Sequence, residues 1–166
     1  MIPEKIALAH RKGDIHIHDL DFYGKTMNCL NIPLGRLLST GFNNGHGFIR
    51  SPRRPTSATA LAAIILQSSQ NDMFGGQSFG FFDYDMAPFM ENASDEEVFQ
   101  AMEALIYNLN SMHSRAGAQV PFSSIDFGTD TSAEGRMVSK NLLLAQDAGL
   151  GNGETPIFPI TIFKVK

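Results

Sequence analysis

The chain has 166 residues, a formal net charge of -4 and 43% hydrophobic residues, which is the size and composition of one ordinary globular domain. No window approaches the roughly 20 apolar residues of a membrane span, and the N-terminus lacks the pattern of a secretory signal. The acidic balance argues against a general DNA- or RNA-binding protein, because such proteins usually carry a basic face. We therefore expect a cytoplasmic protein with no membrane, DNA or RNA among its partners.

Helices and strands are expected to alternate along the first half of the chain. Apolar periodicity and the positions of glycine and proline predict these elements. In chain order they are a helix at 2–11 closed by Gly13, a strand at 14–20, a short extended segment at 27–32, a turn of helix at 34–39, a Gly/Asn-rich loop through Gly47, a largely buried helix at 56–70 entered through Pro52 and Pro55, and a loop at Gly75 and Gly76.

Capping patterns mark the two clearest helices of the second half. Ser94 with Glu97 and Thr131 with Glu134 both have the spacing of a capping box. The elements expected here are helices from 95 to about 114 and from Thr131 to Gly149, and strands at 120–127 and 157–165. Because helices between strands provide the long connections that parallel strands need, the pattern predicts an α/β fold.

Cys29 is the only cysteine, so neither an internal disulfide nor a multi-cysteine zinc site can form within these residues. The thiol lies in an expected strand between Asn28 and Asn31, which is a polar setting. A lone cysteine in a cytosolic protein is more often a small buried hydrophobe. A thiol can also donate a hydrogen atom to a carbon radical, and the residues alone leave both interpretations open.

Two groups of titratable side chains stand out. His16 and His18 share one face of the expected strand, with Asp19 beside them, which could begin a metal site or an acid–base pair. A metal site needs three or more ligands and no other histidine has suitable spacing, so we predict none. We expect these histidines to orient loops or to line a polar substrate wall. The acid pair Asp83 and Asp85 is assigned no chemical role.

Arg50, Arg53 and Arg54 concentrate three guanidinium groups just before the expected helix at 56–70. Backbone N–H groups and the helix dipole at that end also favour anions. A nucleoside triphosphate suits such a loop, and a solvated basic loop is the alternative.

Two further segments combine small residues with polar side chains. In the segment 75–80, glycines permit close approach of a ligand, and Gln77 and Ser78 offer hydrogen-bond donors and acceptors. Ser123 and Ser124 belong to a similar run that leads from a helix into a strand. A plain turn and a routine connection are the alternatives, and the first segment lacks the lysine and spacing of a P-loop.

Together these residues resemble the anaerobic (class III) ribonucleotide reductase family of glycyl-radical enzymes. The similar segments occur in order over essentially the whole chain, and the last two are the most specific. They are 18–21, 28–29, 75–79, 120–129 and 149–159.

The resemblance implies both a fold and a chemistry. The fold is a ten-stranded α/β barrel, and residues 1–166 form a single unit that supplies its first several strands and their helices. In the family, a glycyl radical near the C-terminus generates a thiyl radical on a cysteine inside the barrel. The thiyl takes the ribose 3′ hydrogen, the 2′ hydroxyl leaves as water, and formate supplies reducing equivalents. Cys29 matches a second active-site cysteine, which returns a hydrogen atom at the 2′ position.

The resemblance also implies partners and further site residues. The pocket for a ribonucleoside triphosphate substrate is expected to involve His16, His18, Asn28, Gln77, Ser78, Ser123 and Ser124. Arg50, Arg53 and Arg54 are expected to bind a deoxyribonucleoside-triphosphate effector at a homodimer interface. An iron–sulfur activating enzyme that uses S-adenosylmethionine is the expected partner of the whole enzyme.

Several features of the family are not found among these residues: the cysteine that becomes the thiyl, the glycyl-radical segment, the four-cysteine zinc site and the ATP cone. We therefore expect no cofactor within the chain and no turnover by the chain alone, since radical relay needs all its atoms in contact. Two alternatives stay open. One is a stand-alone dNTP-binding or dimerisation module, and the other is a glycyl-radical enzyme of the formate-lyase type.

Overall fold

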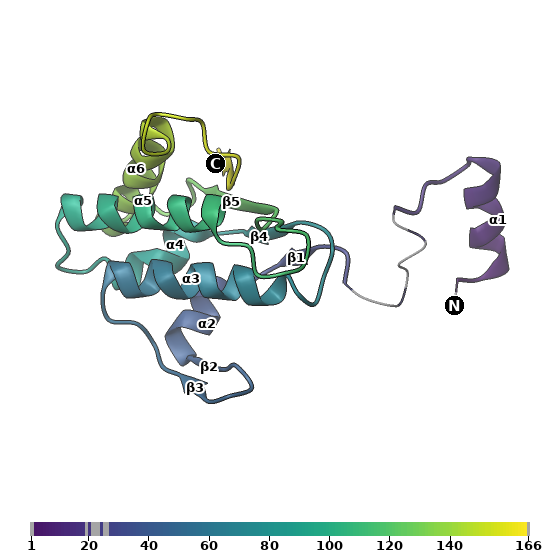
Figure 1. Cartoon of the computed structure of the whole chain (residues 1–166), viewed down its shortest axis with the longest axis horizontal. Helices are drawn as coiled ribbons and strands as arrows, with labels where there is room; N and C mark the ends of the chain where they lie inside the picture. The colour runs from purple at the N-terminus through teal and green to yellow at the C-terminus, as the bar shows by residue number, and fades with distance from the viewer. Residues whose placement is uncertain (1, 19, 21–23, 25–26, 166) are drawn as a thin grey trace.

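A computed structural model describes residues 2–18, 20, 24 and 27–165 of the chain (Figure 1). Helices and strands alternate through them. In chain order the elements are α1 (Glu4–Lys12), β1 (Leu30–Asn31), α2 (Leu34–Thr40), β2 (Phe42–Asn43), β3 (Phe48–Ile49), α3 (Pro55–Ser69), β4 (Gln77–Phe79), α4 (Phe82–Met86), the 3-10 helix η2 (Ala87–Phe89), α5 (Asp95–Ser111), β5 (Ser123–Phe127), α6 (Ala133–Ala148) and β6 (Ile160–Phe163).

Four parallel strands form the central sheet, in the spatial order β1-β4-β5-β6. Neighbours in the sheet therefore follow one another in the chain, and helices connect them. The prediction of an α/β fold is confirmed. The segment at β4 was expected only as a loop, because a three-residue strand next to glycines has little strand propensity of its own. It becomes a strand by pairing with β1 on one side and β5 on the other.

Helices cover one face of this sheet. Along β5 burial alternates, so that Ser123, Ile125 and Phe127 are buried while Ser124 and Asp126 are partly exposed. The buried side chains of β4 and β5 join a core built from the helices. In that core α3 packs on α5 and α5 on α6, and Figure 1 shows α3 and α5 running side by side. In the described part of the chain, no helix covers the opposite face.

The long helices begin where local signals predict, with one correction. Ser94 caps α5 by accepting a hydrogen bond from the backbone N–H of Glu97 at 3.1 Å. For α6 the sequence predicts Thr131 as the cap, but Ser132 takes this role and accepts from the N–H of Gly135 at 3.0 Å. The capping box was therefore placed one residue too early. No helix in the described ranges is long and apolar enough to cross a membrane.

The N-terminal part differs from the sequence-based expectation. Residues 14–18 form bends and a turn rather than the predicted strand. Alternation alone does not make a strand, because a strand needs a partner, and no strand of the described sheet pairs with these residues. Helix α1 ends at Gly13 as expected, where φ is 83°. It buries none of its residues and lies apart from the body of the molecule (Figure 1).

The Gly/Asn-rich segment expected as a loop forms a short hairpin. Strands β2 and β3 pair antiparallel, with Phe42 opposite Ile49. Asparagine side chains close the turn: Asn43 Oδ1 accepts from the N–H of Gly45 at 2.8 Å, and Asn44 Oδ1 from that of Gly47 at 3.0 Å. This use of asparagine as a turn former explains why a loop-like composition makes a hairpin.

Candidate functional site

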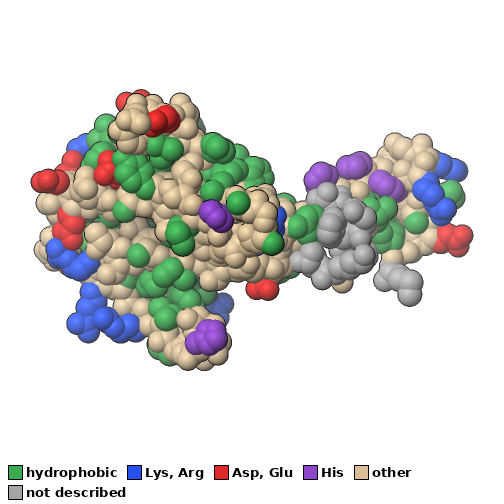
Figure 2. Space-filling view, in the orientation of Figure 1, with side chains coloured by type: hydrophobic (Ala, Val, Ile, Leu, Met, Phe, Trp, Pro, Cys, Tyr) green, Lys and Arg blue, Asp and Glu red, His purple; other side chains and the backbone are tan. Residues whose placement is uncertain are grey.

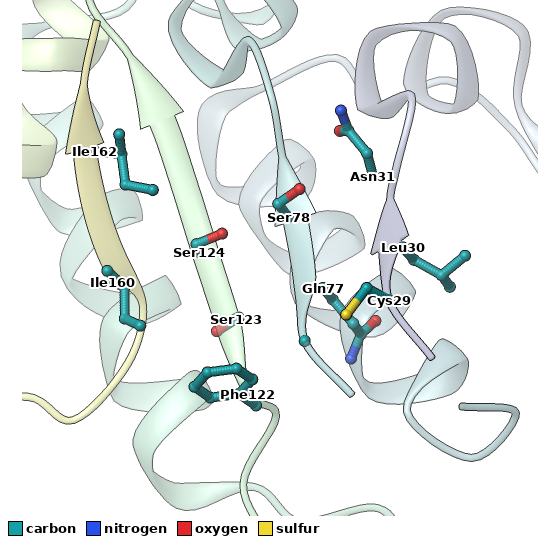
Figure 3. Close-up of a pocket in the computed structure, with 11 residues that line it drawn as sticks. Cys29, Leu30, Asn31, Gln77, Ser78, Phe122, Ser123, Ser124, Ile160 and Ile162 are labelled. Carbon is teal, nitrogen blue, oxygen red and sulfur yellow. The ribbon is translucent and has the colours of Figure 1, made fainter. Parts of the chain in front are cut away.

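A pocket of about 550 Å³ opens on the uncovered face of the sheet (Figure 3). It brings together five of the residues that the sequence predicts for the site: Cys29, Gln77, Ser78, Ser123 and Ser124. The other lining residues are Leu30, Asn31, Gly76, Phe122, Ile160 and Ile162. The pocket therefore joins β1, β4, β5 and β6.

The strand register arranges the polar side chains in rows. Asn31 lies opposite Ser78, and Ser78 lies opposite Ser124, so an amide and two hydroxyls form one row across three strands. Because side chains two residues apart share a face, Cys29 lies on the same face as Asn31. In Figure 3 the sulfur of Cys29 points toward β4, whereas Leu30 points away.

Cys29 is exposed in this pocket and forms no disulfide. The interpretation of Cys29 as a small buried hydrophobe is therefore wrong. Its Sγ donates to Oδ1 of Asn28 at 3.8 Å, a long contact from the adjacent residue. Asn28 is not among the residues that line the pocket, so it borders the site at the entry to β1.

The side chains of Gln77 and Ser123 face the helices instead of the open face. Gln77 is 3% exposed, and its Nε2 donates to the carbonyl oxygen of Leu66 in α3 at 3.1 Å. Its Oε1 accepts from the hydroxyl of Ser69. Ser123 is 2% exposed. Both residues are among those that line the pocket, but period-two alternation turns their side chains away from the face of Ser78 and Ser124, so their contact with a substrate stays a prediction.

The expected histidine pair lies on the N-terminal arm and not in the pocket. The ring centroids of His16 and His18 are 5.7 Å apart, and those of His10 and His16 are 5.8 Å apart. The arm, with its purple histidine side chains, is set apart from the body in Figure 2. Asp19 is outside the described residues. Within the described ranges, no group of three or more His, Cys, Asp or Glu side chains is arranged to hold a metal ion.

An ion pair lies near the carboxyl ends of the strands, outside the lining of the pocket. Nζ of Lys164 lies 3.1 Å from Oδ2 of Asp126, donates to the carbonyl oxygen of Gly80, and sits 4.3 Å from the centroid of the Phe81 ring. The lysine, which follows β6, therefore reaches across β5 to β4. The sequence pattern missed this pair, although Asp126 shares the face of Ser124 two residues earlier.

A buried carboxylate organises the loop after β5, and this role was also missed. Asp83 is fully buried and accepts from the N–H of Gly128 at 2.8 Å, the hydroxyl of Thr129 at 3.2 Å and the N–H of Asp130 at 2.9 Å. Burial raises the pKa of the neighbouring Asp85, and the charge of Asp83 adds to this, while a backbone hydrogen bond from Gly35 acts against it.

The arginine loop borders a second hollow of about 600 Å³, between the β2–β3 hairpin and α3. Arg50, Arg53 and Arg54 all line it and are all exposed. Figure 2 shows basic side chains gathered beside the hairpin. The guanidinium group of Arg54 already forms an ion pair, because its Nη2 lies 2.8 Å from Oε2 of Glu97. The three predicted residues are therefore brought together, on a different surface from Cys29.

The family model described as "Anaerobic ribonucleoside-triphosphate reductase" matches residues 1–166. The chain belongs to this family. Proteins of that name from Salmonella typhimurium and Escherichia coli are 30% and 31% identical to it; each comparison covers 100% of this chain and 27% of the relative. The protein of the same name from Enterobacteria phage T4 is 31% identical, and the comparison covers 100% of this chain and 32% of that protein. The chain thus spans about a third or less of these reductases.

A solved structure shares the fold. It is the anaerobic ribonucleotide reductase from Thermotoga maritima in complex with dATP and CTP, with a TM-score of 0.58 and 14% identity. The similarity covers 86% of this chain and 28% of that one. Membership in the reductase family confirms the resemblance drawn from the sequence and disfavours the formate-lyase alternative.

Proposed function

We propose that this chain forms part of the catalytic barrel of an anaerobic ribonucleoside-triphosphate reductase and that the pocket at Cys29 receives the ribonucleotide. The observation that carries the proposal is the exposed thiol on an open sheet face, next to the hydroxyls of Ser78 and Ser124. A thiol that donates a hydrogen atom must be accessible to its substrate. The family membership supplies the reaction.

The sheet supports the barrel part of this proposal. All four strands are parallel, they follow the chain order, and helices cover one face only. In a barrel the uncovered face becomes the interior and every strand edge is paired. β1 and β6 are the edges of the described sheet, and further strands would pair with them in a ten-stranded barrel.

Cys29 would act on the ribose after the radical has reached it. The glycyl radical supplies the oxidation that starts the reaction. Once the 2′ hydroxyl has left as water, the S–H bond of Cys29 would break and its hydrogen atom would form the new C–H bond at the 2′ carbon. Oxidation of formate to CO2 would then supply two electrons: one, with a proton, restores the thiol of Cys29, and the other reduces the carbonyl left at the 3′ carbon. A four-cysteine zinc site does not fit this chain, since Cys29 is its only cysteine.

The arginine hollow is proposed as an effector site. Arg50 and Arg53 offer exposed guanidinium groups for a triphosphate, and the hollow beside them has room for a nucleoside. The Thermotoga relative was solved with dATP and CTP, which supports a second nucleotide site in the family fold. A homodimer interface at this hollow and activation by an iron–sulfur enzyme using S-adenosylmethionine are part of the same proposal.

Replacing Cys29 tests the central claim. In the reductase that contains this chain, Cys29→Ala should abolish nucleotide reduction while the glycyl-radical signal in electron paramagnetic resonance stays unchanged. Cys29→Ser, which keeps the size and polarity, should also be inactive because an O–H bond releases its hydrogen atom less readily than an S–H bond. Reduction by either variant at the rate of the unaltered enzyme would exclude Cys29 from the reaction.

A further inference from the structure

We infer that Asn31 contacts the ligand of the Cys29 pocket, and that its amide, with the hydroxyls of Ser78 and Ser124, recognises the adjacent hydroxyls of a ribose ring. In the sequence Asn31 stands out only as a polar neighbour of Cys29, and no contact with a ligand is predicted for it. The inference rests on the proposed function, because it requires that the pocket receive a ribonucleotide.

The register places Asn31 where a small ring would meet it. Asn31, Ser78 and Ser124 lie opposite one another on β1, β4 and β5. Neighbouring strands are about 4.8 Å apart, so a ring resting above β4 has the amide on one side and the Ser124 hydroxyl on the other. Cys29 lies one step along β1 on the same face, about 7 Å away along the strand.

Glycines directly before and after β4 make room for this arrangement. A Cβ at Gly80 would lie 3.1 Å from Oδ1 and 3.2 Å from Nδ2 of Asn31, so the amide occupies the space that a side chain would fill. A Cβ at Gly76 would lie 2.9 Å from the ring of Phe122. Between these glycines only the small side chain of Ser78 rises from β4. The base of the pocket is therefore shallow and bordered by Asn31 and Phe122.

The hydrogen-bonding groups of the row are available to a ligand. Across the described ranges, none of the side chains of Asn31, Ser78 and Ser124 makes a hydrogen bond to the protein. Gln77, by contrast, uses both ends of its amide on α3. An amide and two hydroxyls offer donors as well as acceptors, which suits hydroxyl groups that both give and receive hydrogen bonds.

The charge around the row favours neutral hydroxyls over phosphate. Arg36 and Asp85 share a smaller hollow with Asn31, and Asp126 and Lys164 neutralise one another at 3.1 Å. None of the residues that line the Cys29 pocket is charged, so a triphosphate placed over Ser78 and Ser124 would lose hydration without meeting a positive charge there. The sugar of a nucleotide is therefore the part whose chemistry matches Asn31, Ser78 and Ser124.

Titration of the reductase that contains this chain, before its activation, with CTP and with dCTP, followed by NMR at the isotope-labelled backbone amides of Ser78 and Ser124, tests the inference. These local signals separate the pocket from the arginine hollow, where dCTP could also bind. The unaltered chain should bind CTP about fivefold more tightly than dCTP, as expected for one added neutral hydrogen bond. Asn31→Leu, of similar size, should remove this preference by weakening CTP binding about fivefold more than dCTP binding.

The other outcomes separate failure of the pocket proposal from failure of the role of Asn31. If neither nucleotide shifts the signals of the unaltered chain, the proposed substrate pocket fails and the inference with it. If CTP and dCTP bind equally well to the unaltered chain, or if Asn31→Leu keeps the preference, Asn31 has no role in hydroxyl recognition while the pocket proposal stands. Equal weakening of both ligands by Asn31→Leu would assign Asn31 to the structure of the pocket alone.

Discussion

Asp83 and Gly128 lie 45 residues apart in the chain, and the N–H of Gly128 donates to Oδ2 of Asp83 at 2.8 Å. This contact joins the segment after β4 to the segment after β5. A Cβ at Gly128 would lie 2.7 Å from the ring of Phe163, so β6 is packed against the same point. Helix α4, the loop after β5 and the end of β6 are thus held together by a buried carboxylate and a residue without a side chain.

Asp83→Asn should destabilise the protein by about 2–3 kcal/mol. The three groups around Asp83 all donate hydrogen bonds to its carboxylate, and the NH2 group of an asparagine cannot accept them. The free energy of unfolding in urea measures this. Asp147→Asn, at an exposed position of α6, is the matched control and should change it by less than about 0.5 kcal/mol. Equal stability of the two variants would contradict the role of Asp83.

Gly75→Ala should disturb the start of β1. A Cβ at this position would lie 1.9 Å from the carbonyl oxygen of Asn28, a backbone atom that cannot turn aside. We expect a loss of about 1–3 kcal/mol in unfolding free energy. Gly151→Ala serves as the control because its Cβ would meet nothing within 4 Å. If the Gly75→Ala protein is as stable as the control, Gly75 is not packed closely against the backbone of Asn28.

The cap of α6 distinguishes two neighbouring residues. Ser132→Ala should cost about 1 kcal/mol, because the N–H of Gly135 loses its acceptor. Thr131→Ala should have a smaller effect, since its backbone oxygen, which accepts from Nε of Arg136 at 3.1 Å, is retained. Thermal unfolding of both variants decides between them, and a larger loss from Thr131→Ala would restore the cap expected from the sequence.

Asp85 should make stability depend on pH. Burial raises the pKa of this carboxyl above 3.8, so the folded protein disfavours its ionisation. The contribution of Asp85 is fully present below the ordinary aspartate pKa and is lost as the pH rises through the raised value. Asp85→Asn cannot ionise. Its unfolding free energy relative to the unaltered protein should therefore rise from about pH 3 to about pH 7, and a constant or falling difference would contradict the prediction.

The arginines of the loop should differ in their effect on dATP binding. Arg53→Ala should weaken binding about tenfold, as expected for a lost charge-assisted hydrogen bond. Arg54→Ala should weaken it less, since this side chain is shared with Glu97. Isothermal calorimetry of each variant measures the difference. Unchanged affinity after substitution of Arg50, Arg53 and Arg54 together would remove the loop from the effector proposal.

The helices could be predicted from the sequence because their signals are local. Ser94 and Glu97 lie within one turn of α5, and Gly13 ends α1 through its own backbone conformation. The spacing of apolar residues then gives the buried face without knowledge of the partner helix. The residues alone left the role of Cys29 open, and the family resemblance indicated its place in the site together with Ser78, Ser123 and Ser124.

What the sequence could not provide depends on pairing. Which face of the sheet the side chains of Gln77 and Ser78 occupy follows from the register of β4 against β5. A shift of this register by one residue would exchange the two faces. Contacts such as Lys164 with Asp126 join residues far apart in the chain, and no local pattern marks them. The strand expected at 14–20 failed for a related reason, because alternation shows only that a segment is suited to pairing.

The alternation of β5 has a consequence for how this protein can change over evolution. The side chains of Ser123, Ile125 and Phe127 are buried against the helices. Those of Ser124 and Asp126 lie on the open face of the sheet. Tolerance to mutation should therefore alternate along this strand, low at the buried positions and higher at the positions on the open face. Changes in the ligand preference of the pocket would be acquired at the even positions alone, without cost to the packing beneath them.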